Sequence, residues 1–401
     1  MTNKKISLSL KPGCACVCLA FLAQISYADE ELGFRYNNLS VSPYVNLEYT
    51  YNSNVDYSKG QKRDDHIFSI NPGVDLNYKG NDWGLKGNAW YDHDYYHEYD
   101  ILDKDSYGES VDFYWESPKG LKLLLGQRYV NSSQNDSLTS DSGRGLWRDR
   151  NQLDINGALA YQFSEKTSVT LSGLYSDLSY ENDTRKYGGL YGWTLYSVGL
   201  QLARQMTAKS DFLVSGSYQQ YHSDGARGGV DSSSVGYTLM AGVGSRATER
   251  VMYSLKAGAS LFDYAKGDQM AGFVYEGHLS WLMSKKWALS FAGTSSFQPS
   301  EYEVNQADQT YSVSSSLTYK TTRRLTTSLD LAYRREERQI NTANARDGDG
   351  DDRYSARLMA RYKLRKYVNL YAGLEYEEQF SDQNMNEFNR YRGTLGLNLR
   401  Y

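Results

Sequence analysis

The chain has 401 residues and a formal net charge of −4, so its charge balance gives no reason to expect a nucleic-acid partner. Beyond residue 28 it has no apolar run of about 18 residues or more, which excludes a transmembrane helix there. Yet it contains 37 tyrosines, 35 glycines and only 5 prolines. This composition is typical of a membrane β-barrel, in which only every second strand residue must be apolar.

The first 28 residues have the organisation of a secretory signal peptide. Three lysines flank or precede an apolar stretch from Cys14 to Ile25, and Ser26 to Ala28 form a small-x-small cleavage site. Removal of residues 1–28 would take away three lysines and no acids, which changes the net charge from −4 to −7. It would also remove all three cysteines. A secreted chain without disulfides must close its fold by backbone pairing and packing.

Residues 29–42 are short and polar, and we expect a periplasmic segment there, followed by a barrel over residues 43–401. The barrel region contains successive runs in which apolar and polar residues alternate, as they do in strands with one apolar face. The predicted strands have their apolar positions within residues 45–51, 68–78, 83–91, 111–115, 121–129, 153–163, 169–175, 196–202, 212–218, 235–243, 251–261, 273–283, 287–291, 311–319, 325–333, 354–362, 368–376 and 391–401.

The last run, Tyr391 to Tyr401, shows the pattern most clearly. Apolar residues or glycine occupy every odd position, and polar residues or glycine occupy every even one. Ten steps of strand extend about 33 Å, which projects to about 25 Å when the strand is tilted by about 40°. That height matches the apolar band of an outer-membrane barrel. The terminal tyrosine resembles the C-terminal aromatic that the barrel assembly machinery reads; the alternative is the last strand of a soluble sandwich.

The connections between these runs alternate between short and long. Short ones occur near residues 80, 119, 165, 208, 248, 285, 323 and 365. Long ones occur near residues 58–65, 97–106, 133–147, 182–189, 223–231, 266–270, 301–308, 339–352 and 381–386. Short periplasmic turns and long outside loops are the rule in bacterial barrels. We therefore predict an all-β, up-and-down antiparallel transmembrane barrel of about 18 strands, with 16 as the alternative and both termini periplasmic.

The strand face opposite the apolar one carries many charges and should line the lumen. The principal predicted pore-lining residues are Glu48, Asp75, Asp112, Arg334, Arg357, Arg361, Glu375 and Arg392. Charges this numerous would be too costly in a dry core, so they imply water inside, as barrels of 16–18 strands provide. Basic residues gather on late strands and acids on early ones. This predicts opposed charged walls with a field across the pore; alternatively, the charges only hydrate the lumen.

Three aromatic residues, Trp90, Tyr114 and Trp193, also fall on the inward face. Such rings combine a broad apolar face with a polar atom, so they are candidates for stacking against sugars. The alternative is that they only fill space.

The third outside loop, residues 133–147, is polar but contains apolar residues that a solvated loop does not need. We predict that it folds into the lumen as a constriction loop carrying Asp141, Arg144 and Trp147. The alternative is a loop standing in solvent.

Few residues suggest catalysis or metal binding. His93 and His97 share a strand face but would lie about 13 Å apart, too far to chelate one metal. Asp347, Asp349 and Asp351 resemble the start of a calcium loop, but Asp352 and Leu358 occupy its glycine and glutamate positions. A weak divalent site bridging lipopolysaccharide phosphates is one reading of these aspartates, and a flexible acidic loop is the other. We expect no cofactor and no enzymatic activity, because no hydrolase motif is present.

The N-terminal strands resemble a known family. Residues 43–55, Asn71 to Leu76 and Gly84 to Tyr91 are similar to the first three strands of the beta-barrel porins often encoded in exopolysaccharide-export clusters. The resemblance implies an outer-membrane channel for polysaccharide, in contact with lipid and lipopolysaccharide, with a periplasmic export protein as partner. The alternatives are a diffusion porin for small solutes and a closed structural or adhesive barrel.

Overall fold

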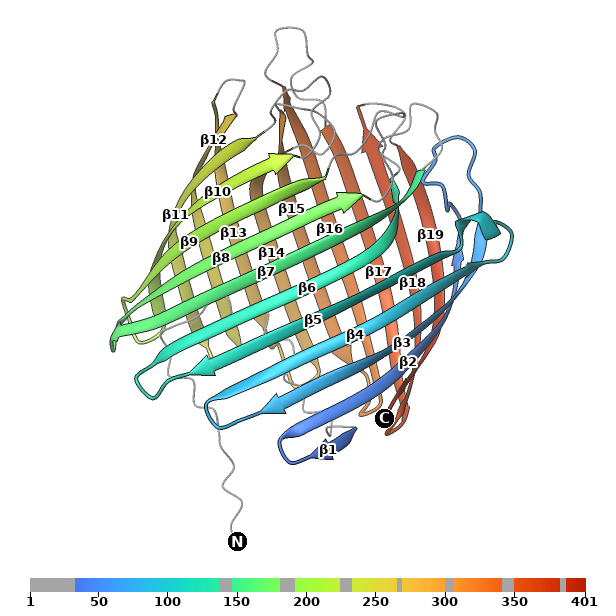
Figure 1. The fold of residues 1–401 in the computed structure, drawn as a ribbon, viewed down its shortest axis with the longest axis horizontal. Helices are drawn as coiled ribbons and strands as arrows, with labels where there is room; N and C mark the ends of the chain where they lie inside the picture. The colour runs from blue at the N-terminus through green and yellow to red at the C-terminus, as the bar shows by residue number, and fades with distance from the viewer. Residues whose placement is uncertain are drawn as a thin grey trace.

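The computed structural model describes residues 33–136, 146–180, 192–223, 233–264, 269–299, 306–340, 350–382 and 387–401. These residues form one antiparallel sheet of 18 long strands, β2 to β19, that closes on itself, with a short strand β1 beside it (Figure 1). The predicted all-β barrel of 18 strands is therefore confirmed. The predicted signal peptide lies outside the described residues and stays a prediction.

The strands are β1 (Phe34–Tyr36), β2 (Leu39–Asn52), β3 (Asp65–Lys79), β4 (Trp83–Tyr96), β5 (Lys104–Glu116), β6 (Leu121–Asp136), β7 (Leu146–Ser164), β8 (Thr167–Tyr180), β9 (Trp193–Gln205), β10 (Ser210–Ser223), β11 (Ser234–Thr248), β12 (Val251–Tyr264), β13 (Met270–Trp281), β14 (Trp287–Pro299), β15 (Gln306–Lys320), β16 (Leu325–Ile340), β17 (Gly350–Arg365), β18 (Val368–Ser381) and β19 (Phe388–Arg400). Among the described residues there is one short 3-10 helix, Asp100–Leu102, and no helix is long and apolar enough to cross a membrane.

Each barrel strand pairs with the next along the chain, and the last pairs with the first. The closing ladder between β19 and β2 runs from Arg392 opposite Asn52 to Arg400 opposite Tyr44. Figure 1 shows the C-terminus and β1 at the end of the barrel that carries the short turns. Closure leaves the barrel without a free edge. A sheet in lipid must be closed in this way, because no water is present there to form hydrogen bonds with unpaired backbone groups.

The strands extend further than the sequence predicted, mainly toward the long loops. The barrel begins at Leu39, not at residue 43, and β1 lies within the segment expected to precede it. β1 folds back as a hairpin on β2, and Phe34 packs against the terminal Tyr401 with ring centroids 4.8 Å apart. The N-terminal hairpin therefore covers the end of the closing strand.

Alternation divides every strand into an apolar outward face and a polar inward face. Leu239 and Leu374 are each 64% exposed, and such apolar side chains cover the outside of the barrel. On β2, Tyr49 and Tyr51 face outward, whereas Glu48 and Thr50 line a cavity inside. An apolar outside with a polar lumen is the arrangement that lipid outside and water inside demand.

One junction in the wall departs from this regularity. The ladder between β13 and β14 covers only residues from Trp281 opposite Leu289 to Glu276 opposite Thr294. Beyond it, Phe297 of β14 packs against Phe262 and Val274, whose partners in the register place them on the inward face. Here the upper part of β14 leans over the inner surface of its neighbours.

The two faces can be tested with a matched pair of substitutions in the middle of β16. Leu331 faces outward and Ala332 faces inward, between Asp330 and Arg334. Leu331→Arg should destabilise the barrel by about 2–4 kcal/mol, the cost of a charge at the centre of the lipid face. Ala332→Arg should leave folding nearly unchanged. Urea titration of each variant folded into lipid vesicles measures both values, and the reverse order would mean that the register is displaced by one residue.

Candidate functional site

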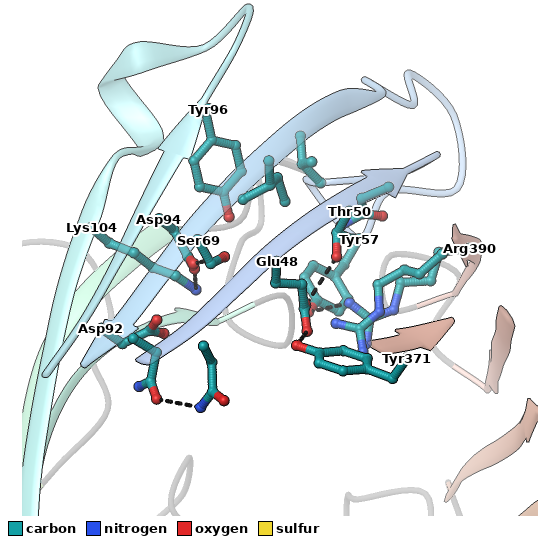
Figure 2. A pocket seen from close by; sticks show the side chains of 16 residues that line it. Glu48, Thr50, Tyr57, Ser69, Asp92, Asp94, Tyr96, Lys104, Tyr371 and Arg390 are labelled. Carbon is teal, nitrogen blue, oxygen red and sulfur yellow. Dashed lines mark hydrogen bonds and ion pairs between the residues drawn. The ribbon is translucent and has the colours of Figure 1, made fainter. Parts of the chain in front are cut away.

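A cavity of about 340 Å³ lies inside the barrel against the wall formed by β2, β3, β4, β5, β18 and β19 (Figure 2). Charged and aromatic residues line it together with amide, hydroxyl and a few aliphatic side chains. Acidic residues are Glu48, Asp92 and Asp94; basic residues are Lys104, Arg390 and Arg392; aromatic residues are Tyr57, Tyr96 and Tyr371. Successive side chains of a strand point to opposite faces, so each strand contributes every second residue to the cavity. Its chemistry is that of a polar binding surface.

Glu48 organises one side of the cavity through hydroxyl donors. The Tyr371 hydroxyl donates to Glu48 Oε2 at 2.8 Å, and Thr50 Oγ1 donates to Glu48 Oε1 at 3.0 Å. Thr50 is in turn 3.0 Å from Thr394 Oγ1 on β19. The hydrogen bonds to Glu48 are drawn in Figure 2, and with the contact to Thr394 they link β2 to β18 and β19.

Asp94 anchors the facing side. It accepts a hydrogen bond from Ser69 on β3 and forms an ion pair of 3.2 Å with Lys104 at the start of β5. The pairing register places these three residues directly beside one another on consecutive strands. The charge of Asp94 is thereby balanced within the wall.

The basic side consists of arginines that share two glutamates on β18. Arg390 Nε donates to Glu377 at 2.6 Å and Arg392 Nη2 donates to Glu375 at 2.8 Å. From β17, Arg353 lies 3.0 Å from Glu377. The network continues to Arg357, which is 3.8 Å from Glu375. More arginines than glutamates take part, so this part of the wall keeps a positive charge.

The connection between β2 and β3, residues 53–64, folds over the cavity. Asn54 is fully buried; its Nδ2 donates to Ser58 O at 2.8 Å and to Asn389 O on β19 at 2.9 Å. Tyr57 follows with a φ of 53°, a left-handed conformation that is uncommon for a bulky residue. Arg390 holds it there, because its guanidinium lies 4.5 Å from the ring centroid and donates to the hydroxyl at 2.5 Å.

The connection between β4 and β5, residues 97–103, is fastened by one buried carboxylate. Asp65 accepts hydrogen bonds from the backbone N–H groups of its neighbour His66 at 2.6 Å and of residues 97, 98 and 99 at 3.0–3.1 Å. Beneath the two connections lies an apolar cluster formed by Val55, Ile67, Tyr96 and Leu102. The two connections thus form one packed rim above the cavity, which no local sequence pattern predicted.

The predicted pore-lining residues all fall on the inward face, as the register of their strands requires: Glu48, Asp75, Asp112, Arg334, Arg357, Arg361, Glu375 and Arg392. Only Glu48 and Arg392 line the cavity. The expectation of opposed charged walls was wrong. The basic strands β16–β19 and the acidic strands β2–β5 are neighbours, because β19 pairs with β2.

Other predicted positions lie partly or wholly outside the described residues. Residues 133–136 belong to β6, and Trp147 belongs to β7, opposite Asn135, so the third loop is shorter than predicted. Asp141 and Arg144 fall outside the described residues, as do Asp347 and Asp349. Asp351 is a buried residue of β17, and no group of three metal-ligating side chains occurs in the part of the chain that the structure describes.

Two of the three aromatic candidates lie flat against the wall, each over a glycine on the paired strand: Trp90 covers Gly108, and Tyr114 covers Gly84. A Cβ added to these glycines would lie 2.9 Å and 2.3 Å from the rings. Glycine is therefore required beside each ring, and the sequence reading did not anticipate this pairing. Trp193 on β9 packs instead against Tyr221, with ring centroids 5.8 Å apart.

Comparison with known proteins identifies the sequence relationship. The family described as "Putative beta-barrel porin 2" matches residues 29–401. No curated protein matches the sequence.

Solved structures match the fold at low sequence identity. The apoprotein form of the FrpB iron transporter from Neisseria meningitidis (F5-1 variant) has a TM-score of 0.50 and 8% identity, covering 92% of this chain and 82% of that one. Another structure of this variant has a TM-score of 0.47 and 10% identity. The match covers 88% of the present chain but only 65% of the length of that transporter. For the outer membrane protein OpdK from Pseudomonas aeruginosa the TM-score is 0.45 and the identity 10%, covering 90% and 99%. The first of these likenesses shows a shared barrel fold.

The rim depends on Asp65, and its removal should loosen residues 98 and 99 selectively. Asp65→Ala leaves the backbone N–H groups of these two residues without their acceptor, whereas that of residue 97 keeps His66 O, and should weaken local protection of the first two amides by about 1–3 kcal/mol. Hydrogen exchange measured by mass spectrometry on the folded barrel gives this value. Asp64→Ala, at the exposed neighbouring position, is the control. Unchanged exchange at residues 98 and 99 would mean that the apolar cluster alone holds the rim.

The arginines on the inward face of β17 and β19 should control the ion selectivity of the channel. Changing Arg357, Arg361 and Arg392 together to glutamine leaves Glu375 and Glu377 with fewer cations, so the cation-to-anion permeability ratio should rise by about twofold or more. Reversal potentials in a salt gradient across a planar bilayer measure the ratio. Arg324→Gln, in a short turn, should leave it unchanged. Equal reversal potentials for the triple variant and the native barrel would remove these side chains from the ion path.

Proposed function

The chain belongs to the family described as putative beta-barrel porin 2, and from this premise we propose that its outer-membrane β-barrel is a passive channel through which exopolysaccharide leaves the cell. The observation that carries the proposal is a closed 18-stranded barrel whose inward face carries charged and polar side chains. Barrels of this strand number enclose an aqueous channel. A hydrophilic polymer needs such a path, because lipid cannot solvate it.

The inner surface supports a sugar polymer in particular. Trp90 and Tyr114 lie flat over glycines on the inward face, and polar or charged residues are their neighbours along the strands. Flat rings bind the apolar faces of sugars without obstructing the path, and polar groups exchange hydrogen bonds with water as the chain moves. The resemblance of the first three strands to porins of exopolysaccharide-export clusters points the same way.

The orientation and partners follow from the same proposal. The short turns, both termini and the β1 hairpin would face the periplasm, where a polysaccharide-export protein would deliver the polymer. The long connections, including the rim over the cavity, would face outside among lipopolysaccharide. The barrel assembly machinery would insert the chain and recognise the strand that ends at Tyr401.

A diffusion porin for small solutes is the second candidate. The packed rim of residues 53–64 and 97–103 favours it, because ordered loops over the mouth narrow the passage. The two candidates differ in direction and in the size of the cargo, so a genetic experiment separates them.

Deletion of the gene should lower extracellular polysaccharide severalfold and raise its periplasmic amount, measured as total hexose in the two fractions. Complementation with the native gene should restore secretion, as should the Ala332→Arg variant, whereas Leu331→Arg should not. Unchanged secretion, together with slower uptake of small solutes by the deletion strain, would contradict the export proposal and favour the diffusion porin.

A further inference from the structure

Four asparagines from four consecutive strands form a row across the barrel closure. Asn369 on β18, Asn398 on β19, Asn46 on β2 and Asn71 on β3 are successive partners in the pairing register. Their side chains bond in one direction. Asn369 Nδ2 donates to Asn398 Oδ1 at 3.4 Å, Asn398 donates to Asn46, and Asn46 Nδ2 donates to Asn71 Oδ1 at 2.9 Å. We call this row the asparagine ladder.

The ladder leaves hydrogen-bonding capacity directed at the lumen. Each amide has two N–H donors and an oxygen that can accept twice. Within the row, Asn398 and Asn46 each use one donor and one acceptor site. The last member, Asn71, donates onward to Tyr91 O at 3.1 Å. Asn46 and Asn71 line the cavity, so their remaining donors and acceptors meet its contents.

The spacing of the ladder matches a sugar chain. Neighbouring strands lie about 4.8 Å apart, so four asparagines span about 14 Å. A pyranose unit in a β-linked chain advances by a length close to one strand spacing, and the row would therefore accommodate about three sugars. Because barrel strands are tilted by about 40°, a chain lying on the row would cross the lumen wall obliquely.

Aromatic rings flank the ladder on both sides. Tyr371 lies over Gly396, two residues from Asn398 along β19, and Tyr44 lies over Gly73, two residues from Asn71 along β3. A Cβ at either glycine would come within 2.0 Å or 2.3 Å of the ring. Both rings are thus pressed flat on the wall, in the orientation that sugars need for stacking.

The four asparagines are uncharged, although Lys363 on β17 follows Asn369 in the same row and the rows beside the ladder are charged. On one side lie Glu48 and the pair of Asp94 with Lys104. On the other side, Asp75 pairs with Arg400. Amides flanked by rings offer hydrogen bonds without a net charge, which suits a neutral, hydroxyl-rich ligand.

From these contacts we infer that the asparagine ladder, with Tyr44 and Tyr371, is a binding subsite for a neutral pyranose segment of about three residues. The inference rests on the proposed function as a polysaccharide channel and adds the place where the moving chain is held. Asn46 and Asn398 supply hydrogen bonds to sugar hydroxyls, and Tyr371 supplies the stacking face.

Block of single-channel current by oligosaccharides tests the subsite. Cellohexaose added to the native barrel in a planar bilayer should cause transient closures, whereas the β-(1→4)-linked hexamer of glucuronic acid, its anionic counterpart, should cause far fewer. In the Asn46→Ala/Asn398→Ala variant the apparent Kd for cellohexaose should rise by about tenfold, since two hydrogen-bonding groups are lost, while the open-channel conductance is kept. Asn156→Ala, at an inward position of β7, is the matched control and should bind like the native protein.

If the asparagine ladder only stabilised the closure between β19 and β2, the double variant would behave differently. It would lower the temperature at which the barrel unfolds in detergent but leave cellohexaose block unchanged in the folded fraction, and that result would overturn the inference. If the double variant does not fold, a comparison of Tyr371→Ala with Tyr371→Phe decides. The closures caused by cellohexaose should become shorter in Tyr371→Ala, which loses the ring, but not in Tyr371→Phe, which keeps it. Absence of block in the native channel, while deletion still abolishes secretion, would refute the subsite and leave the proposed function standing.

Discussion

Every other feature of this protein depends on the hydrogen-bonded ladder between β19 and β2. Inside a membrane an unpaired peptide group costs several kcal/mol, so a sheet is tolerated only when its two edges meet. Here the two edges come from opposite ends of the barrel sequence, and side chains 344 and 352 positions apart are also joined across the closure, Thr50 to Thr394 and Asn46 to Asn398. Closure then fixes which residues face water, and the cavity forms against the strands that close the barrel.

The inner surface is unequal around its circumference. From β16 through the closure to β5 the inward positions carry arginines, carboxylates and flat aromatic rings. From β10 to β15 serine, threonine and glycine recur at these positions, as in the contacts of Thr238 with Ser260 and of Thr294 with Ser312. This part of the wall also holds the ion pair of Lys256 with Glu276 and the apolar cluster around Phe262. The charged residues and flat rings are therefore denser on the side of the cavity.

Much of the architecture could be predicted from the sequence, because alternation is a local property and turns are short. The pattern from Tyr391 to Tyr401 reads directly as a strand. The rim could not be predicted, since Asn54 is held by the backbone of Asn389, at the far end of the chain. The same limit explains the error over charged walls: the acidic and basic strands are distant in sequence and adjacent in the ring. The asparagine ladder was readable only once the register of four strands was known.

The short ladder between β13 and β14 makes the barrel mechanically uneven. The resistance of a closed sheet to lateral force increases with the number of hydrogen-bonded residue pairs between two strands. Here the pairing stops at Glu276 opposite Thr294. Above that point a side-chain bond from Gln309 Nε2 to Phe273 O, at 3.1 Å, and the contact of Phe297 with Phe262 carry the connection. Under tension or in denaturant, β13 and β14 would therefore separate first, starting at the end where their pairing stops. Among the described barrel strands, the junction with the shortest ladder thus lies several strands away from the closure and from the cavity.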